Sequence, residues 1–259
     1  PVVNTLLAKM YLNAEVYTGT PMYDQAVSYA NKVIHEGGFG LEKNYRNLFC
    51  GENHLSPLHG NEIIFAIPCD GENAKSYGNS IMVTAAAYGG LLNPKWLGMD
   101  ASWTCLKPCS QLVKQFDYSP VAGYDHHGST LKKDSRFIFF DVKEYVDGEN
   151  GDNCTEQGVK TRRDVVPVLT DWNSGYLCHK FTNLGWDQNE VTPSAWPDTD
   201  FPLFRLADIY LIYAECAARQ ATGADVSTAV GYINLLRERA NGCLLYTSPS
   251  PRDVEETRM

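Results

Sequence analysis

Arg205-Leu206-Ala207-Asp208-Ile209-Tyr210-Leu211-Ile212-Tyr213-Ala214-Glu215-Cys216-Ala217-Ala218-Arg219 is the stretch of sequence that decides the fold. It consists mainly of helix-forming and apolar residues without proline or glycine, and Thr222-Gly223 follows it as a stop signal. A further helix is expected over residues 226–239, where apolar residues recur at helical spacing. Together these segments predict a helical hairpin over residues 205–240.

A second hairpin is expected near the start of the chain, over residues 5–36. Its two helices are predicted over residues 5–17 and 24–36, because apolar residues recur there at three- and four-residue spacing. Asp24 is the expected cap of the second helix, and Gly37-Gly38 is expected to end it in the left-handed conformation.

The two hairpins resemble each other in sequence. Leu6 to Glu15 aligns with Leu206 to Glu215, and Ala26-Val27-Ser28-Tyr29-Ala30-Asn31 matches Ala229-Val230-Gly231-Tyr232-Ile233-Asn234. Repeated helical pairs are typical of the tetratricopeptide arrangement, in which each hairpin buries its apolar stripe against a neighbour. Chance similarity between amphipathic helices is the alternative. The matching glutamates, Glu15 and Glu215, are expected to have a structural role.

The segment between the hairpins, residues 39–202, has a different composition. It holds all five tryptophans together with many glycines, prolines and asparagines. Short strands are expected over residues 62–67 and 135–140, and a short helix over residues 109–116. We therefore expect a mainly α fold of tetratricopeptide-like hairpins, an α-α superhelix, with a loop-rich, irregular cap that contains short strands and carries the binding groups.

Composition narrows the classes of function. The 259 residues include 22 Lys and Arg against 31 Asp and Glu, a net charge of -9, which disfavours a nucleic-acid partner. A hydrophobic content of 44% is that of a globular chain with a sizeable core. No apolar run in the sequence reaches the length of a membrane span.

The last residues, 243–259, are expected to lie outside the fold. Residues 243–253 have no periodicity, and with suitable codons they back-translate to the transposon-end adapter of sequencing libraries. We interpret residues 243–259 as a non-native tail and residues 1–242 as the domain, with a natural Ser/Pro linker as the alternative. The seven cysteines before the tail are irregularly spaced, which favours free thiols over a disulfide framework.

A series of short motifs follows the same order as in one known family. In chain order they are Asn61-Glu62-Ile63-Ile64-Phe65-Ala66-Ile67, Trp103 with Leu112-Val113, Asp134-Ser135-Arg136, Lys180-Phe181-Thr182-Asn183, Phe204-Arg205-Leu206-Ala207-Asp208 and Ile233-Asn234-Leu235-Leu236-Arg237-Glu238-Arg239-Ala240. In this order they resemble the SusD/RagB-like proteins. The two helical motifs near the end are the most specific, and the resemblance covers nearly all of residues 1–242.

The resemblance implies a function at the bacterial cell surface. It implies a lipoprotein of the outer membrane that captures oligosaccharides or polysaccharides and passes them to a TonB-dependent transporter of the SusC type. It also implies tetratricopeptide-like hairpins with a loop-rich portion that carries the ligand site. We expect the lipid-anchored N-terminal region and the final helices of the family to be missing from this sequence.

One loop region holds the side chains that a glycan site needs. Sugars present apolar C–H faces and hydroxyl edges, so their sites combine aromatic rings with amide or charged groups. The expected ligand-binding residues are Tyr77, Asn79, Tyr88, Trp96 and Trp103. Trp96 is the preferred exposed ring, whereas Trp103 precedes an apolar stripe and is expected to anchor the core. The sequence assigns no role to Trp172, Trp186 or Trp196.

Catalytic and metal-binding motifs are absent from the sequence. It contains no Gly-x-Ser-x-Gly, His-Glu-x-x-His, phosphate-loop or dinucleotide fingerprint. The acidic run over residues 147–153 lacks the glycine and the terminal glutamate of a calcium loop, and His126-His127 is expected in an exposed loop. We expect a protein without enzymatic activity, cofactor or metal. A protein-interaction scaffold built of helical repeats and a glycoside hydrolase fragment remain alternatives.

Overall fold

The computed structural model describes residues 1–85, 94–101, 103, 105, 106, 108, 112, 136, 139, 140 and 177–240. The contacts divide the chain into two compact units. The first unit comprises Pro1–Asn44, Ser56–Ile67 and Pro202–Met259, and the second comprises Tyr45–Leu55 and Pro68–Phe201. The expected non-native tail, residues 243–259, lies outside the described residues.

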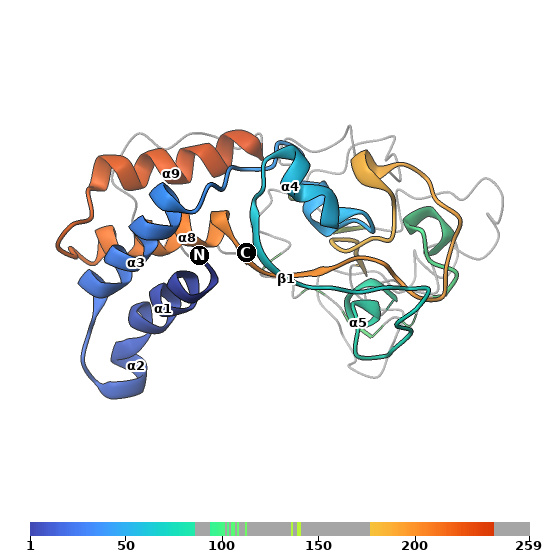
Figure 1. Cartoon of the computed structure of the whole chain (residues 1–259), viewed down its shortest axis with the longest axis horizontal. Coiled ribbons are helices and arrows are strands. Elements are labelled where there is room, and N and C mark those ends of the chain that lie inside the picture. Colours follow the sequence, from blue (N-terminus) through green and yellow to red (C-terminus); the bar gives the residue numbers. More distant parts are fainter. Residues whose placement is uncertain are drawn as a thin grey trace. The chain divides into compact units, whose positions relative to one another are not determined.

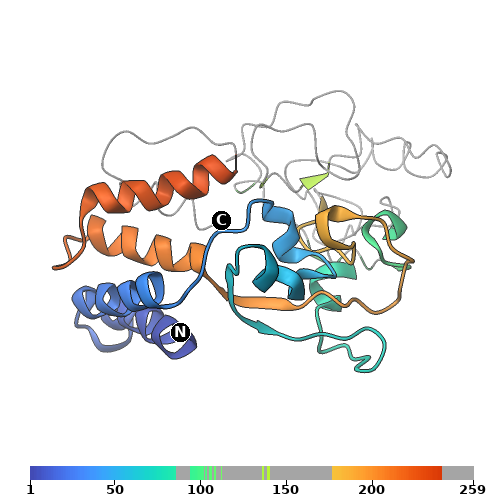
Figure 2. The same cartoon turned by 45° about the horizontal axis from the view of Figure 1, so that its top comes forward.

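The first unit is built on two helical hairpins. Its longer elements are α1 (Val2–Leu12), α2 (Ala14–Thr18), α3 (Tyr23–Glu36), α8 (Leu206–Ala218) and α9 (Val226–Arg239). α1 packs against α3, α3 against α8, and α8 against α9, so the two hairpins form one stack (Figures 1 and 2). The helices predicted over residues 24–36, 205–219 and 226–239 and the common layer of the two hairpins are therefore confirmed.

The sequence explains why α8 lies in the middle of this stack. α8 is apolar around most of its circumference, and a helix of this kind needs neighbours on more than one side. α3 and α9 supply them (Figure 2). The buried residues of α8 are accordingly Leu206, Ala207, Ile209, Leu211, Ile212, Tyr213, Ala214, Cys216 and Ala217.

A stacked pair of tyrosines joins the two helices of each hairpin. Tyr11 and Tyr29 have ring centroids 5.5 Å apart at an interplanar angle of 5°. Tyr210 and Tyr232 repeat the arrangement at 4.3 Å and 4°. Tyr29 and Tyr232 occupy the same position of the repeated sequence pattern. Their partners Tyr11 and Tyr210 are offset by one position in the aligned first helices, so the stacking is repeated with only one of its two residues at a matching position.

The repeated glutamates have the structural role that we expected. Glu15 accepts a hydrogen bond from the hydroxyl of Tyr23, and Glu215 accepts two from the guanidinium of Arg219 at 3.0 and 3.2 Å. The Arg219 guanidinium also lies 4.9 Å from the centre of the Tyr23 ring. These contacts tie the two hairpins together near their turns.

The structure corrects two expectations about the first hairpin. Asp24 does not cap α3: the cap position is Met22, and the Asp24 carboxylate instead accepts the backbone N–H of Thr222 at 2.7 Å. The helix expected over residues 5–17 is divided at Asn13, whose side-chain amide donates to the carbonyl of Lys9 at 2.8 Å. Side chains of this kind compete with the backbone for its hydrogen bonds.

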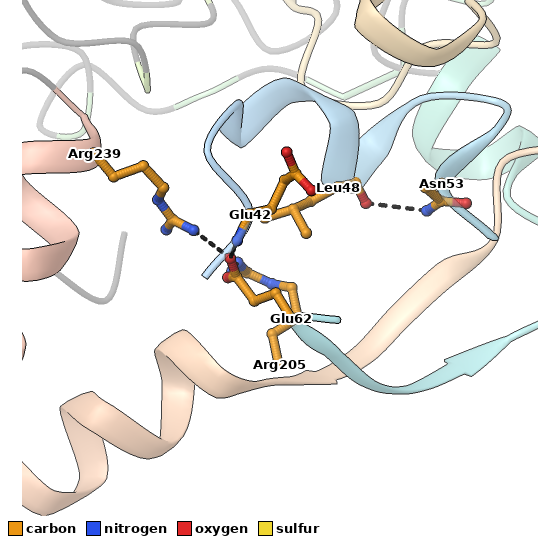
Figure 3. Close-up of polar contacts among 6 residues, drawn as sticks. All are labelled: Glu42, Leu48, Asn53, Glu62, Arg205 and Arg239. Carbon is orange, nitrogen blue, oxygen red and sulfur yellow. Dashed lines mark hydrogen bonds and ion pairs between the residues drawn. The ribbon is translucent and has the colours of Figure 1, made fainter. Parts of the chain in front are cut away.

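A buried carboxylate joins the helices of the first unit to its strands. β1 (Ile63–Ile67) pairs with β4 (Phe201–Arg205), and Glu62, which precedes β1, is fully buried. The Glu62 carboxylate accepts hydrogen bonds from the guanidinium groups of Arg205, at 2.9 Å, and Arg239, and from the backbone N–H of Glu42 at 2.8 Å (Figure 3). We call these four residues the Glu62 cluster. The strand predicted over residues 62–67 is confirmed.

The second unit consists of short elements and loops. Those it contains, among its described residues, include η1 (Tyr45–Phe49), η2 (Asn53–Leu55), α5 (Ile81–Thr84), η4 (Pro94–Leu97), β2 (Phe139–Phe140), β3 (Leu177–Cys178) and η6 (Trp186–Gln188). β2 and β3 are antiparallel, with Phe139 opposite Cys178. Of the helix expected over residues 109–116, only Leu112 is described, and it is helical.

Candidate functional site

The candidate site lies on a small apolar core in the second unit. The buried members of this core are Ile81, Ala85, Leu97, Met99 and Leu184. Three tryptophans, Trp96, Trp103 and Trp196, pack against it while each remains partly exposed. α5 and η4 supply core residues from segments that are close in sequence, whereas Leu184 comes from a distant loop.

Tyr77 brings two of these tryptophans together. Its ring centroid lies 5.1 Å from that of Trp196, at an interplanar angle of 63°, and 6.0 Å from that of Trp103, at 41°. The Tyr77 side chain is 69% exposed, so its ring is open to a ligand. The backbone N–H of Trp103 donates to the carbonyl of Ala85 at 2.8 Å, which fixes Trp103 at the end of α5. We call Tyr77, Trp103 and Trp196 the aromatic cluster.

Two aspartates that follow Trp196, Asp198 and Asp200, hold the loop that carries it. Asp198 accepts the backbone N–H of Gly71 at 2.8 Å and donates its own N–H to the side chain of Asn183 at 2.7 Å. Asp200 accepts the N–H of Cys69 at 2.9 Å. The amide of Asn53 donates to the carbonyls of Leu48 (Figure 3) and Asp200 at 3.0 and 2.9 Å. Trp196 is thus presented by a loop with many backbone restraints.

Two glycines allow the loops to approach closely. A Cβ atom added to Gly71 would lie 2.3 Å from the carbonyl oxygen of Trp196, which is well inside van der Waals contact. Gly98 has a positive φ of 76°, and a Cβ there would lie 2.5 Å from the carbonyl oxygen of Asn183. Larger residues at either position would displace the backbone next to the aromatic cluster.

The structure describes four of the five residues that the sequence proposed for ligand binding. Tyr77 and Trp103 lie together in the aromatic cluster. Trp96 packs on the same core. The Asn79 side chain accepts the N–H of Ile81 at 2.9 Å and so holds the start of α5. Tyr88 lies outside the described residues.

Trp196 is the site residue that the sequence did not identify. It lies between Pro193 and Asp198 in a segment without periodicity, more than ninety residues after Trp103. Hydrogen bonds of Asp198 with Gly71 and Asn183, those of Ser194 with Gly98 and Asp100, and packing on the apolar core hold its loop there. A weak signal was available in its two flanking prolines, which favour an extended, exposed loop.

Hydrogen bonding and burial shift the pKa values of two aspartates in these loops. The N–H groups of Asn73 and Glu72 lower the pKa of Asp70, whose carboxylate they contact at 2.7–3.0 Å. Burial raises the pKa of Asp200, and its bond from Cys69 opposes that shift. Both carboxylates therefore serve to hold loop backbone in place.

Other kinds of site are not found in the described part of the chain. No three His, Cys, Asp or Glu side chains among the described residues are placed to bind a metal ion. The cysteines that the structure describes are free thiols, of which Cys50 and Cys216 are buried and Cys105 is exposed. In the same residues, no helix has the length and apolar character that crossing a membrane requires.

Known proteins match this arrangement in sequence and in fold. Residues 61–249 match the sequence model of the SusD family. The chain belongs to the SusD family. It is 33% identical over 252 residues to the starch-binding protein SusD of Bacteroides thetaiotaomicron, a match that covers 91% of this chain and 44% of that protein. This SusD-family chain therefore spans about half the length of the curated relative that it matches.

Solved structures show the same fold. A SusD superfamily protein from Parabacteroides distasonis matches with a TM-score of 0.60 at 18% identity, covering 99% of this chain and 47% of that one. Surface glycan-binding protein A from Bacteroides thetaiotaomicron matches with a TM-score of 0.63 at 18% identity, covering 99% and 50%. The mainly α, tetratricopeptide-like fold class expected from the sequence is the SusD fold and is confirmed.

Proposed function

We propose that this chain binds oligosaccharides without modifying them, and that the aromatic cluster is the surface on which the sugar rings stack. The observation that carries the proposal is that Trp103 and Trp196 pack on one core and the largely exposed Tyr77 ring contacts both of them. Membership of the SusD family supports it, as does the starch-binding function named for the 33% identical relative.

The inclination of the rings indicates the kind of ligand. Because the Tyr77 ring is tilted by 63° and 41° from its two neighbours, one flat sugar cannot stack on all three rings. An oligosaccharide with several residues could place successive sugar faces on successive rings, each contact burying apolar C–H groups. Starch-derived oligosaccharides are the first ligands to test, because the matched relative is named for starch binding.

The proposal includes the cellular setting that the family resemblance implies. The chain would act as part of a surface-exposed lipoprotein of the bacterial outer membrane. It would pass its oligosaccharide to a TonB-dependent transporter of the SusC type. A gene for such a transporter beside the gene for this chain would support this setting, and affinity isolation of the two proteins together would test their contact directly.

Isothermal titration calorimetry with maltooligosaccharides tests the binding site. Tyr77→Ala should weaken binding by about 1–3 kcal/mol, the scale of one lost aromatic contact. Tyr17→Ala is the matched control, because Tyr17 is also 69% exposed but belongs to the first unit. The control should bind as the wild type does, and circular dichroism should show both variants folded.

Two outcomes would contradict the proposal. Unchanged affinity of folded Tyr77→Ala for every bound oligosaccharide would place the site elsewhere in the chain. Shorter oligosaccharides appearing during incubation with the pure chain would contradict the absence of catalysis and support the hydrolase alternative. Trp96→Ala measured in parallel would show whether this fourth ring extends the surface, since it packs on the same core.

A further inference from the structure

Two serine hydroxyls hold the backbone beside two rings of the aromatic cluster. The hydroxyl oxygen of Ser194 accepts the backbone N–H of Trp196 at 3.1 Å. The hydroxyl oxygen of Ser76 accepts the N–H of Gly78 at 3.0 Å, and Tyr77 lies between them in the chain. Each hydroxyl reaches the amide two residues ahead, which is a turn that serine forms readily. The Tyr77 and Trp196 rings, whose centroids are 5.1 Å apart, are therefore presented from turns of one kind.

Ser194 is itself anchored to the apolar core of the second unit. Its backbone N–H donates to the carbonyl of Gly98 at 3.1 Å, and its carbonyl accepts the N–H of Asp100 at 3.0 Å. These bonds form a parallel bridge opposite Met99, which is fully buried. The Ser194 hydroxyl then reaches Trp196 from this anchored position. The backbone of Trp196 therefore has a point of attachment to the core only two residues away.

The orientation of the Trp196 ring matters because the ring is partly exposed. An exposed ring on a loop can adopt several orientations, and only those that fit a sugar face contribute to binding. The apparent dissociation constant rises in proportion as the binding-competent fraction falls. The net contribution of one neutral hydrogen bond corresponds to about a three- to tenfold change in an equilibrium. Loss of the Ser194 hydroxyl is thus large enough to be measured as a change in affinity.

We propose that Ser194 is a positioning residue for oligosaccharide binding, whose hydroxyl orients Trp196 against Tyr77 before the sugar arrives. Ser76 has the same role for Tyr77. The inference rests on the proposed function, because the placement of the rings matters only if the aromatic cluster binds the sugar. Neither serine needs to touch the ligand, since each acts through the ring that it holds.

A double-mutant cycle of Ser194→Ala and Trp196→Ala, measured by isothermal titration calorimetry with maltooligosaccharides, tests this role. Alanine removes the hydroxyl and keeps the two backbone bonds of residue 194. Ser194→Ala should weaken binding about three- to tenfold in the wild-type chain and should have no effect when Trp196 is already alanine. Ser194→Thr retains a hydroxyl and should bind as the wild type does. Ser76→Ala with Tyr77→Ala forms the same cycle for the second serine.

Thr18→Val is the matched control. The Thr18 hydroxyl oxygen accepts the N–H of Thr20 at 3.2 Å in the same kind of turn, but in the first unit. This variant should bind as the wild type does. Near-ultraviolet circular dichroism adds a measurement without ligand, because it reports the fixed packing of aromatic side chains. Ser194→Ala should shift the spectrum toward that of Trp196→Ala, and Ser194→Thr should not.

The outcomes separate this inference from the proposed function. Unchanged binding by Trp196→Ala would remove the proposed function from this ring, and the positioning role with it. Weaker binding by Trp196→Ala, with the affinity and spectrum of Ser194→Ala unchanged, would leave the site in place and overturn the positioning role alone. Equal weakening by Ser194→Ala with and without Trp196 would also overturn it, because the hydroxyl would then act independently of the ring.

Discussion

Replacing Glu62 by glutamine should lower the free energy of unfolding by about 3–5 kcal/mol, the range for breaking a buried ion pair. The Glu62 side chain is fully buried and accepts hydrogen bonds from two guanidinium groups and one backbone N–H. The side chains of Arg205 and Arg239 are only 19 and 8% exposed. Glutamine removes the negative charge and leaves both cations with little access to water.

Urea denaturation followed by far-ultraviolet circular dichroism measures this loss, because the helices of the first unit dominate the signal. Glu215→Gln is the matched control. Its partner Arg219 has a side chain that is 45% exposed, so that change should cost about 0–1 kcal/mol. Equal losses of unfolding free energy in Glu62→Gln and Glu215→Gln would refute the reasoning, because burial of the Glu62 cluster would then contribute nothing to stability.

Three further predictions follow from single residues. Gly71→Ala should lower the free energy of unfolding measured by urea denaturation by about 1–3 kcal/mol, since its Cβ would meet the carbonyl of Trp196. An unchanged midpoint of the urea transition would show that the two loops can move apart at little cost. Burial raises the pKa of the Glu42 carboxyl above 4.5, so the folded chain holds this proton more tightly than the unfolded chain does. The free energy of unfolding should therefore fall as pH rises from 4.5 through the raised pKa. Glu42→Gln should flatten this dependence of stability on pH, and a dependence that persists in the variant would exclude Glu42 as its cause. Hydrogen bonds from Thr228 lower the pKa of Asp225 below 3.8, so the stability that its carboxylate contributes is present above pH 3.8 and is lost as pH falls through the lowered pKa. Thermal melts should show that Asp225→Asn reduces this loss of stability in acid. At neutral pH, Asp225→Ala should lower Tm because it removes the helix cap, whereas Asp225→Asn should not.

The helical frame could be predicted from the sequence because its signals are local. The apolar periodicity of α8 and the repeated pattern that contains Tyr29 and Tyr232 depend on neighbours within a few residues. The strand over residues 62–67 has the same kind of local signal. The position of Asp24 shows the limit of such signals, because its carboxylate reaches the distant Thr222 in preference to its own helix.

The aromatic cluster could be predicted only in part. Tyr77 and Trp103 lie in a region where aromatic, glycine and amide residues are concentrated, and that concentration drew attention to them. Trp196 reaches the same place through hydrogen bonds between loops that are distant in sequence. The Glu62 cluster likewise combines residues from four separate segments. Contacts of this kind depend on tertiary packing, which no local pattern encodes.

The placement of α8 against α3 has a consequence for the synthesis of this protein on the ribosome. α3 ends at Glu36 and α8 begins at Leu206, so the first hairpin emerges long before its partner is translated. At a synthesis rate of about 5–20 residues per second, that interval lasts on the order of ten seconds or more. During it, the buried face of α3 has no second hairpin to cover it. The nascent chain therefore passes through a state in which the apolar face of α3 is exposed. Chaperones, or nascent chains on neighbouring ribosomes, can bind this face before α8 does.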